Sequence, residues 1–237
     1  MKRLLAYSFF LLASLLHSQN PFDAVRRNLG SDEYKRCLAI LDSLNSKGAQ
    51  GDSVLFYKGL VNVKSGNGKE CLQICEKLAK QYPGFVEVHY LRGLVYFQEE
   101  NYGKSANEFT KALRANPGDI KALYNRSLSL GMMENYLTAI EDLSSCIEKD
   151  PNHVAAHYSR AYWYEFTGNY DGALKDYQVV IQLDPKNFDA YFGLAYIYQV
   201  QKETAKACET INSAIHNGSQ IAEDIKERFC SENHGKH

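Results

Sequence analysis

The sequence of 237 residues is short of several features that define whole classes of protein. Lys and Arg number 27 and Asp and Glu number 28, so the formal net charge is only −1. Recognition of phosphate backbones needs a basic surface, and we therefore expect no nucleic-acid partner. Gly and Pro number only 16 and 5, which excludes a collagen-like or low-complexity chain.

Long apolar runs are also scarce, and the one that stands out is residues 4–16, after Met1-Lys2-Arg3. It is shorter than the roughly 20 residues that span a bilayer. A basic start, a short apolar run and small polar residues predict a secretory signal peptide over residues 1–18. We expect an exported protein, periplasmic or secreted, without membrane insertion after cleavage; the alternative is an anchor formed by an uncleaved N-terminal segment.

Catalytic and metal-binding motifs are missing as well. The sequence contains no HExxH, GxSxG or CxxC pattern, and the segment Gly66-Asn67-Gly68-Lys69 lacks the earlier glycine of a phosphate-binding loop. We therefore expect no enzyme, no cofactor and no metal site.

Four of the five prolines, Pro83, Pro117, Pro151 and Pro185, recur at equal intervals of 34 residues. This period divides the chain into five units, 52–85, 86–119, 120–153, 154–187 and 188–221. Aligned, the units share two columns of small residues, which are Gly59, Gly93, Ser127, Ala161 and Ala195, and Cys71, Ser105, Ala139, Ala173 and Ala207. Small residues at helical spacing predict two closely packed antiparallel helices in each unit.

The unit Val154–Asn187 resembles a tetratricopeptide repeat. It carries Tyr164, the turn Gly168-Asn169-Tyr170, Ala173, Tyr177 and Asp184-Pro185 at the family's positions. The resemblance implies an all-α fold, a right-handed α-solenoid of antiparallel helix pairs. We interpret residues 19–51 as a divergent N-terminal cap, residues 222–232 as a C-terminal capping helix and residues 233–237 as a tail.

Comparison of the units also predicts ion pairs between the two helices of a hairpin. Three arginines at the same position of their units are each followed, 16 residues later, by an acidic residue. The pairs are Arg92 and Glu108, Arg126 and Asp142, and Arg160 and Asp176. In the last unit both are lost, as Leu194 and Thr210. The alternative is that both columns are merely solvated.

Five of the six cysteines fall into two groups, and the sixth, Cys75, lies four residues after Cys71 on the same predicted helix. Cys37, Cys71 and Cys146 occupy small-residue columns and are expected to be buried, unbonded residues. Cys208 and Cys230 lie on the two arms of a predicted hairpin around Gly218, so a disulfide between them is possible, and the sequence leaves open whether it forms. Exported bacterial proteins of this repeat type look similar in this region.

The resemblance further implies that the first helices line a concave groove. The groove residues would be Phe56, Leu60, Tyr90, Leu94, Phe97, Tyr124, Leu128, Met132, Tyr158, Tyr162, Phe166, Phe192 and Tyr196. Family members that grip a C-terminal carboxylate place Lys and Asn here, so that activity is not carried over. The expected function is a non-catalytic scaffold or adaptor whose partner is a protein or peptide segment. The alternative is a structural subunit of a cell-envelope assembly that uses its convex or end surfaces. The oligomeric state is not indicated.

Overall fold

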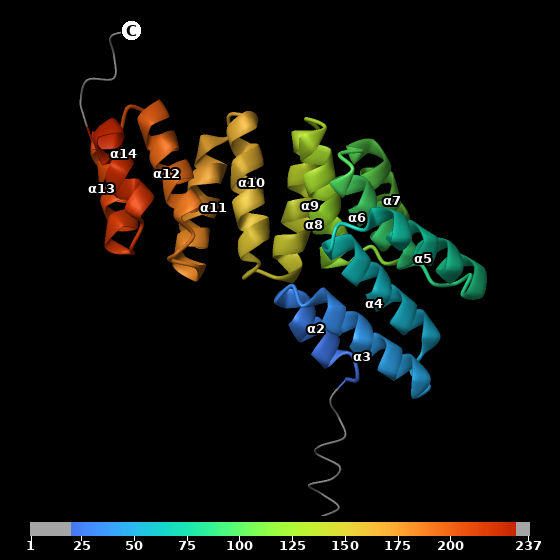
Figure 1. Cartoon of the computed structure of the whole chain (residues 1–237). Helices are drawn as coiled ribbons and strands as arrows, with labels where there is room; N and C mark the ends of the chain where they lie inside the picture. Colours follow the sequence, from blue (N-terminus) through green and yellow to red (C-terminus); the bar gives the residue numbers. More distant parts are fainter. Residues whose placement is uncertain (1–19, 231–237) are drawn as a thin grey trace, which may run out of the picture. The chain divides into compact units, whose positions relative to one another are not determined.

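The computed structural model describes residues 20–230, and within this range the regular secondary structure is entirely α-helical (Figure 1). The chain divides into two compact units between Glu99 and Glu100. This boundary falls inside the predicted unit 86–119, between its two helices. The predicted signal peptide lies outside the described residues. Among the residues described, no helix combines the length and apolar character needed to cross a membrane.

The first unit contains five helices, and neighbours in the sequence pack together. They are α2 (Asp23–Gly30), α3 (Tyr34–Ser46), α4 (Gly51–Lys64), α5 (Gly68–Gln81) and α6 (Val88–Gln98). Two apolar clusters hold this unit. One joins α2, α3 and α4 around Val25 and Leu41, and the other joins α4, α5 and α6 around Leu78 and Leu91.

The second unit contains eight helices, and each packs against the next one along the chain. They are α7 (Tyr102–Ala115), α8 (Ile120–Met132), α9 (Tyr136–Lys149), α10 (Val154–Phe166), α11 (Tyr170–Leu183), α12 (Phe188–Val200), α13 (Thr204–His216) and α14 (Gln220–Cys230). The fold is therefore a series of antiparallel helix pairs, in which α8 and α9, α10 and α11, and α12 and α13 form three complete hairpins.

The same turn recurs in the hairpins. It contains a residue with positive φ, between 57° and 79°, and these residues recur with the period of the prolines: Asp32, Gly66, Glu100, Glu134, Gly168 and Lys202. The following residue is the N-cap of the second helix, and the side chains of Asn101 and Asn169 accept a hydrogen bond there from a backbone N–H. This cap satisfies a donor that the helix itself leaves unpaired.

Small residues allow the close helix contacts that their columns predict. Ala161, Ala173, Ala195 and Ala207 are completely buried. A Cβ atom on Gly59 would lie 2.6 Å from Leu91 Cδ1. The fit of small residues against large ones therefore sets the distance between helices.

Candidate functional site

The predicted groove residues lie on the first helices of the hairpins, and none of them belongs to the fully buried core. Five are on α4 and α6 in the first unit and are half-buried. The other eight, on α8, α10 and α12, are called the aromatic face here: Tyr124, Leu128, Met132, Tyr158, Tyr162, Phe166, Phe192 and Tyr196. Its most exposed members are Met132 at 51%, Tyr162 at 41%, Phe166 at 53% and Tyr196 at 48%.

The rings near the end of α10 contact one another closely. The rings of Phe166 and Tyr136 stack with centroids 4.9 Å apart, and Tyr162 meets Phe166 edge-on at 5.1 Å. Trp163 lies 5.6 Å from Tyr136 and packs against Gly131, where a Cβ atom would be 2.2 Å from its ring. Sequence reasoning missed Tyr136. The tyrosines at the same position of the adjacent repeats, Tyr102 and Tyr170, could have indicated it.

A carboxylate lies among these aromatic residues. Glu165 on α10 accepts a hydrogen bond from the hydroxyl of Tyr177, a side chain that is only 1% exposed. The rings of Tyr177 and Tyr158 meet edge-on at 5.8 Å. Burial raises the pKa of Glu165, while the hydrogen bond from Tyr177 opposes this shift. Sequence reasoning did not single out Glu165.

A second carboxylate, that of Asp189, also influences the pKa of a tyrosine in this group. Burial raises the pKa of Tyr158, and the charges of Asp189 and Glu165 add to the rise. Tyr136 behaves similarly, since burial and the charge of Glu134 both raise its pKa. The aromatic face thus lies next to several negative charges.

The predicted ion pairs of the second unit are confirmed and are bidentate. Arg126 donates to the Oδ2 and Oδ1 atoms of Asp142 at 2.7 and 2.6 Å, and Arg160 donates to both Asp176 oxygens at 2.7 and 2.8 Å. Asp142 and Asp176 are 5% and 3% exposed, so these are buried pairs rather than solvated charges. The predicted pair of Arg92 with Glu108 has one residue in each unit and stays a prediction.

Each of these arginines also donates a hydrogen bond to the second helix of the preceding repeat. The Nη1 atom of Arg126 donates to Thr110 at 3.2 Å, and that of Arg160 donates to Ser144 at 3.0 Å. In the first unit, Lys58 has Ile74 at the acidic position and pairs instead with the earlier Asp42, at 2.6 Å. Arg126 and Arg160 therefore connect successive second helices, a role that the sequence comparison did not reveal.

The last repeat replaces this connection with a hollow. Leu194 and Thr210 stand where the two preceding repeats have Arg and Asp, and Gln178 stands at the position of Ser144 and Thr110. A cavity of about 390 Å³ lies there, lined by Gln178, Ile181, Gln182, Tyr191, Leu194, Thr210 and Ser213.

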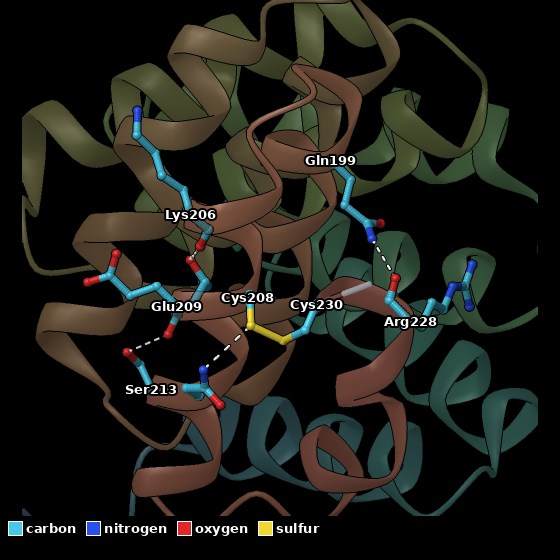
Figure 2. The surroundings of a disulfide bond; sticks show 9 residues. Gln199, Lys206, Cys208, Glu209, Ser213, Arg228 and Cys230 are labelled. Atoms are coloured by element: carbon cyan, nitrogen blue, oxygen red, sulfur yellow. Dashed lines mark hydrogen bonds between the residues drawn. A yellow bond between two sulfur atoms is a disulfide. The ribbon is translucent and has the colours of Figure 1, made fainter. Parts of the chain in front are cut away.

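The C-terminal helices are joined covalently. Cys208 of α13 and Cys230 of α14 form a disulfide, with Cα atoms 4.7 Å apart (Figure 2). Beside it, the amide of Gln199 on α12 donates to the Arg228 carbonyl at 3.0 Å, so that α14 is fixed to two helices. Ala222 and Phe229 bury the inner side of α14 against α12 and α13.

The remaining cysteines of the described chain are buried and form no disulfide. They are Cys37, Cys71, Cys75 and Cys146. Burial raises the pKa of Cys146 to about 12 and also raises that of Cys37, so both thiols are unreactive at neutral pH. Within residues 20–230, no group of three or more His, Cys, Asp or Glu side chains could hold a metal ion.

Comparison with solved structures supports the fold. A crystal structure of MamA aligns with a TM-score of 0.64 at 19% identity, covering 70% of this chain and 96% of the other. A tetratricopeptide repeat protein from Parabacteroides merdae aligns with a TM-score of 0.61 at 18% identity, covering 88% and 84%. MamA from Desulfovibrio magneticus aligns with a TM-score of 0.55 at 17% identity, covering 70% and 94%. Similarity at this level of identity concerns the fold.

Family models identify the repeats directly, whereas no curated protein matches the sequence. A TPR repeat model matches residues 167–202, and two tetratricopeptide repeat models match residues 86–119 and 189–217. No catalytic family is indicated by these matches. Proteins built from such repeats generally act as scaffolds that bind other proteins. Helix pairs, repeat period and sequence matches agree, and the chain is a tetratricopeptide repeat protein.

Proposed function

We propose that the chain is an exported, non-catalytic scaffold that binds a protein or peptide segment on its aromatic face. The observation that carries this proposal is the exposure of large apolar side chains at matching positions of successive first helices. Tyr162 on α10 and Tyr196 on α12 occupy the same position of their repeats and are 41% and 48% exposed. Such rings offer apolar area at a low entropic cost, because each has few rotatable bonds.

The rings are held in place before any partner arrives. Tyr162, Phe166 and Tyr136 pack on one another, and Trp163 lies beneath them against Gly131. A surface that is already ordered loses little entropy on binding, which favours affinity for an extended or helical segment with apolar anchors.

Export is supported by the sequence of residues 1–18 and by the bond between Cys208 and Cys230. Disulfides persist in oxidising compartments and are rare in the cytosol. Sequencing the N-terminus of the protein from its native host tests this part. A start near Gln19 supports cleavage, and an intact Met1 supports the alternative of an anchored chain.

A second candidate, an envelope subunit that uses its outer surfaces, is favoured by a separate set of exposed residues. Leu137 on α9, Leu183 on α11 and Ile221 on α14 are 70%, 40% and 64% exposed, and all three lie outside the first helices of the hairpins.

The two candidates are distinguished by a pair of matched variants of the chain from Gln19 to His237. One changes Tyr162, Phe166 and Tyr196 to Ser, and the other changes Leu137, Leu183 and Ile221 to Ser. Both must give the helical circular dichroism of the parent before partners are captured from native cell-envelope extract. A partner lost by the first variant and retained by the second supports the aromatic face. The reverse result supports the envelope subunit and contradicts the scaffold proposal.

A further inference from the structure

The carboxylate of Glu165 distinguishes one repeat from all the others. The equivalent residues in the other four units are Val63, Phe97, Gly131 and Gln199, none of which is charged. The hydrogen-bond donor is equally specific to this repeat. Tyr177 corresponds to Cys75, Phe109, Leu143 and Ile211, none of which has a hydroxyl group. The acid and the phenol therefore occur together in a single hairpin.

Glu165 lies on the same side of α10 as two tyrosines of the aromatic face. Tyr162 and Tyr158 precede it by three and seven positions, which places all three on one helical face. The negative charge of Glu165 raises the pKa of Tyr158, and the electrostatic interaction with Tyr162 raises the pKa of Tyr177. The carboxylate is thus half-buried among aromatic rings, whose faces carry partial negative charge.

The anion has no basic partner among the residues that the structure describes. Its hydrogen bond comes from the neutral hydroxyl of Tyr177, which occupies Oε1 and leaves Oε2 for another donor. The neighbouring arginines are already used, since Arg126 and Arg160 pair with Asp142 and Asp176.

A purely structural role would not require a charge at this position. The hydroxyl of Tyr177 needs one acceptor, which a glutamine would supply without the cost of removing an ionised group from water. The negative charge of Asp189 also raises the pKa of Tyr158. The charge at Glu165 therefore suits a ligand that is positively charged.

We propose that Glu165, together with the rings of Tyr158 and Tyr162, binds an arginine or lysine side chain of the segment that occupies the aromatic face. The inference rests on the proposed function and adds the chemistry of the partner, a peptide with a basic residue beside apolar ones. The cation would contact the ring faces and donate to Oε2, which combines cation–π attraction with a charge-assisted hydrogen bond.

The test uses phage-displayed random nonapeptides selected on the chain from Gln19 to His237. Parallel selections use Glu165→Gln, which keeps an acceptor for Tyr177 but removes the charge, and Tyr177→Phe, which keeps the charge but removes the donor. Glu141→Gln removes an exposed carboxylate from α9 and serves as the matched control. A triple variant with Ser in place of Tyr162, Phe166 and Tyr196 removes the apolar anchors. Circular dichroism and thermal melting first establish that every variant is folded.

We expect the parent, Glu141→Gln and Tyr177→Phe to enrich peptides with Arg or Lys beside apolar residues. Replacing that basic residue by Gln in a synthetic peptide should weaken binding to the parent about tenfold and leave binding to Glu165→Gln within about twofold. Enrichment of apolar peptides without a basic residue, or an equal basic preference in Glu165→Gln, overturns the inference and leaves the proposed function standing. If the parent enriches no more peptides than the triple Ser variant does, both the inference and the proposed function are overturned.

Discussion

At the scale of single residues, the buried Asp176 and the half-buried Glu165 illustrate two different uses of charge. Asp176 is paired with Arg160 and also contacts His157 Nδ1 at 2.7 Å, so its charge is fully engaged in packing α10 against α11. Glu165 has one neutral donor, Tyr177, and faces aromatic rings. The first arrangement stabilises a hairpin, whereas the second keeps a charge in a place where it lowers stability.

This difference predicts how stability depends on pH at Glu165. Because burial raises its pKa, the folded protein binds the proton more tightly than the unfolded chain does. The stability contributed by the protonated form is therefore present at low pH and is lost as the pH rises through the folded-state pKa. Glu165→Gln should raise the free energy of unfolding at about pH 8 by up to about 1 kcal/mol, and the gain should disappear near pH 4.

Urea denaturation at both pH values measures this effect, with Glu141→Gln as the exposed control that should change little. A gain that is larger in acid than at neutral pH would show that the charge of Glu165 stabilises the fold. Loss of stability for the benefit of a binding residue is a common compromise in functional sites.

At the scale of helices, the arginines of the repeated ion pairs connect one hairpin with the next. Arg126 and Arg160 each connect the second helix of their own hairpin with the preceding second helix. The last repeat has lost this connection and contains a hollow of about 390 Å³ instead. The pattern of the other repeats indicates how the connection could be restored.

Leu194→Arg combined with Thr210→Asp should rebuild the pair, with Gln178 as the third partner. Each single change should lower stability, because it buries a charge that lacks its counterpart. The double variant should recover about 2 kcal/mol relative to the sum of the single changes. Chemical denaturation of the four proteins measures this coupling energy, and a coupling near zero would contradict the assigned role of the column.

Much of the hairpin architecture could be predicted from the sequence, because the repeats supply an internal comparison. Columns of small residues, such as the one that ends with Ala161 and Ala195, indicate where two helices pack closely. The link from Arg160 back to Ser144 could not be predicted, because it joins residues of different columns in neighbouring repeats. The turns were hidden for another reason. Glu134 has a φ of 61°, a conformation that its residue type does not suggest.

The aromatic residues on the first helices were expected to form a groove because of the resemblance to tetratricopeptide repeats, and their role in binding stays a prediction. Tyr136 was missed because it begins a second helix, and Glu165 was missed because its column is uncharged elsewhere. Interactions that are specific to one repeat cannot be recognised from features that the repeats share.

At the scale of the whole molecule, stability should be local, since the helices contact mainly their neighbours along the chain. An array of this kind behaves as a sum of repeat and interface terms, so a change at one end has little effect far away. The C-terminal end offers a reversible change of this kind. The bond between Cys208 and Cys230 fixes α14, and the remaining cysteines of the described chain are already reduced.

Reduction of the disulfide should therefore accelerate amide hydrogen exchange in α14 and α13, while exchange in α4 and α5 stays unchanged. Breaking a disulfide that closes a loop of this length lowers the local opening free energy by about 3 kcal/mol. This change corresponds to about a hundredfold faster exchange. Exchange measured by mass spectrometry with and without reductant tests this, and the double variant Cys208→Ser, Cys230→Ser should match the reduced parent. Uniform acceleration along the chain would mean that the repeats unfold as one cooperative body, because only then does a bond at one end stabilise helices at the other.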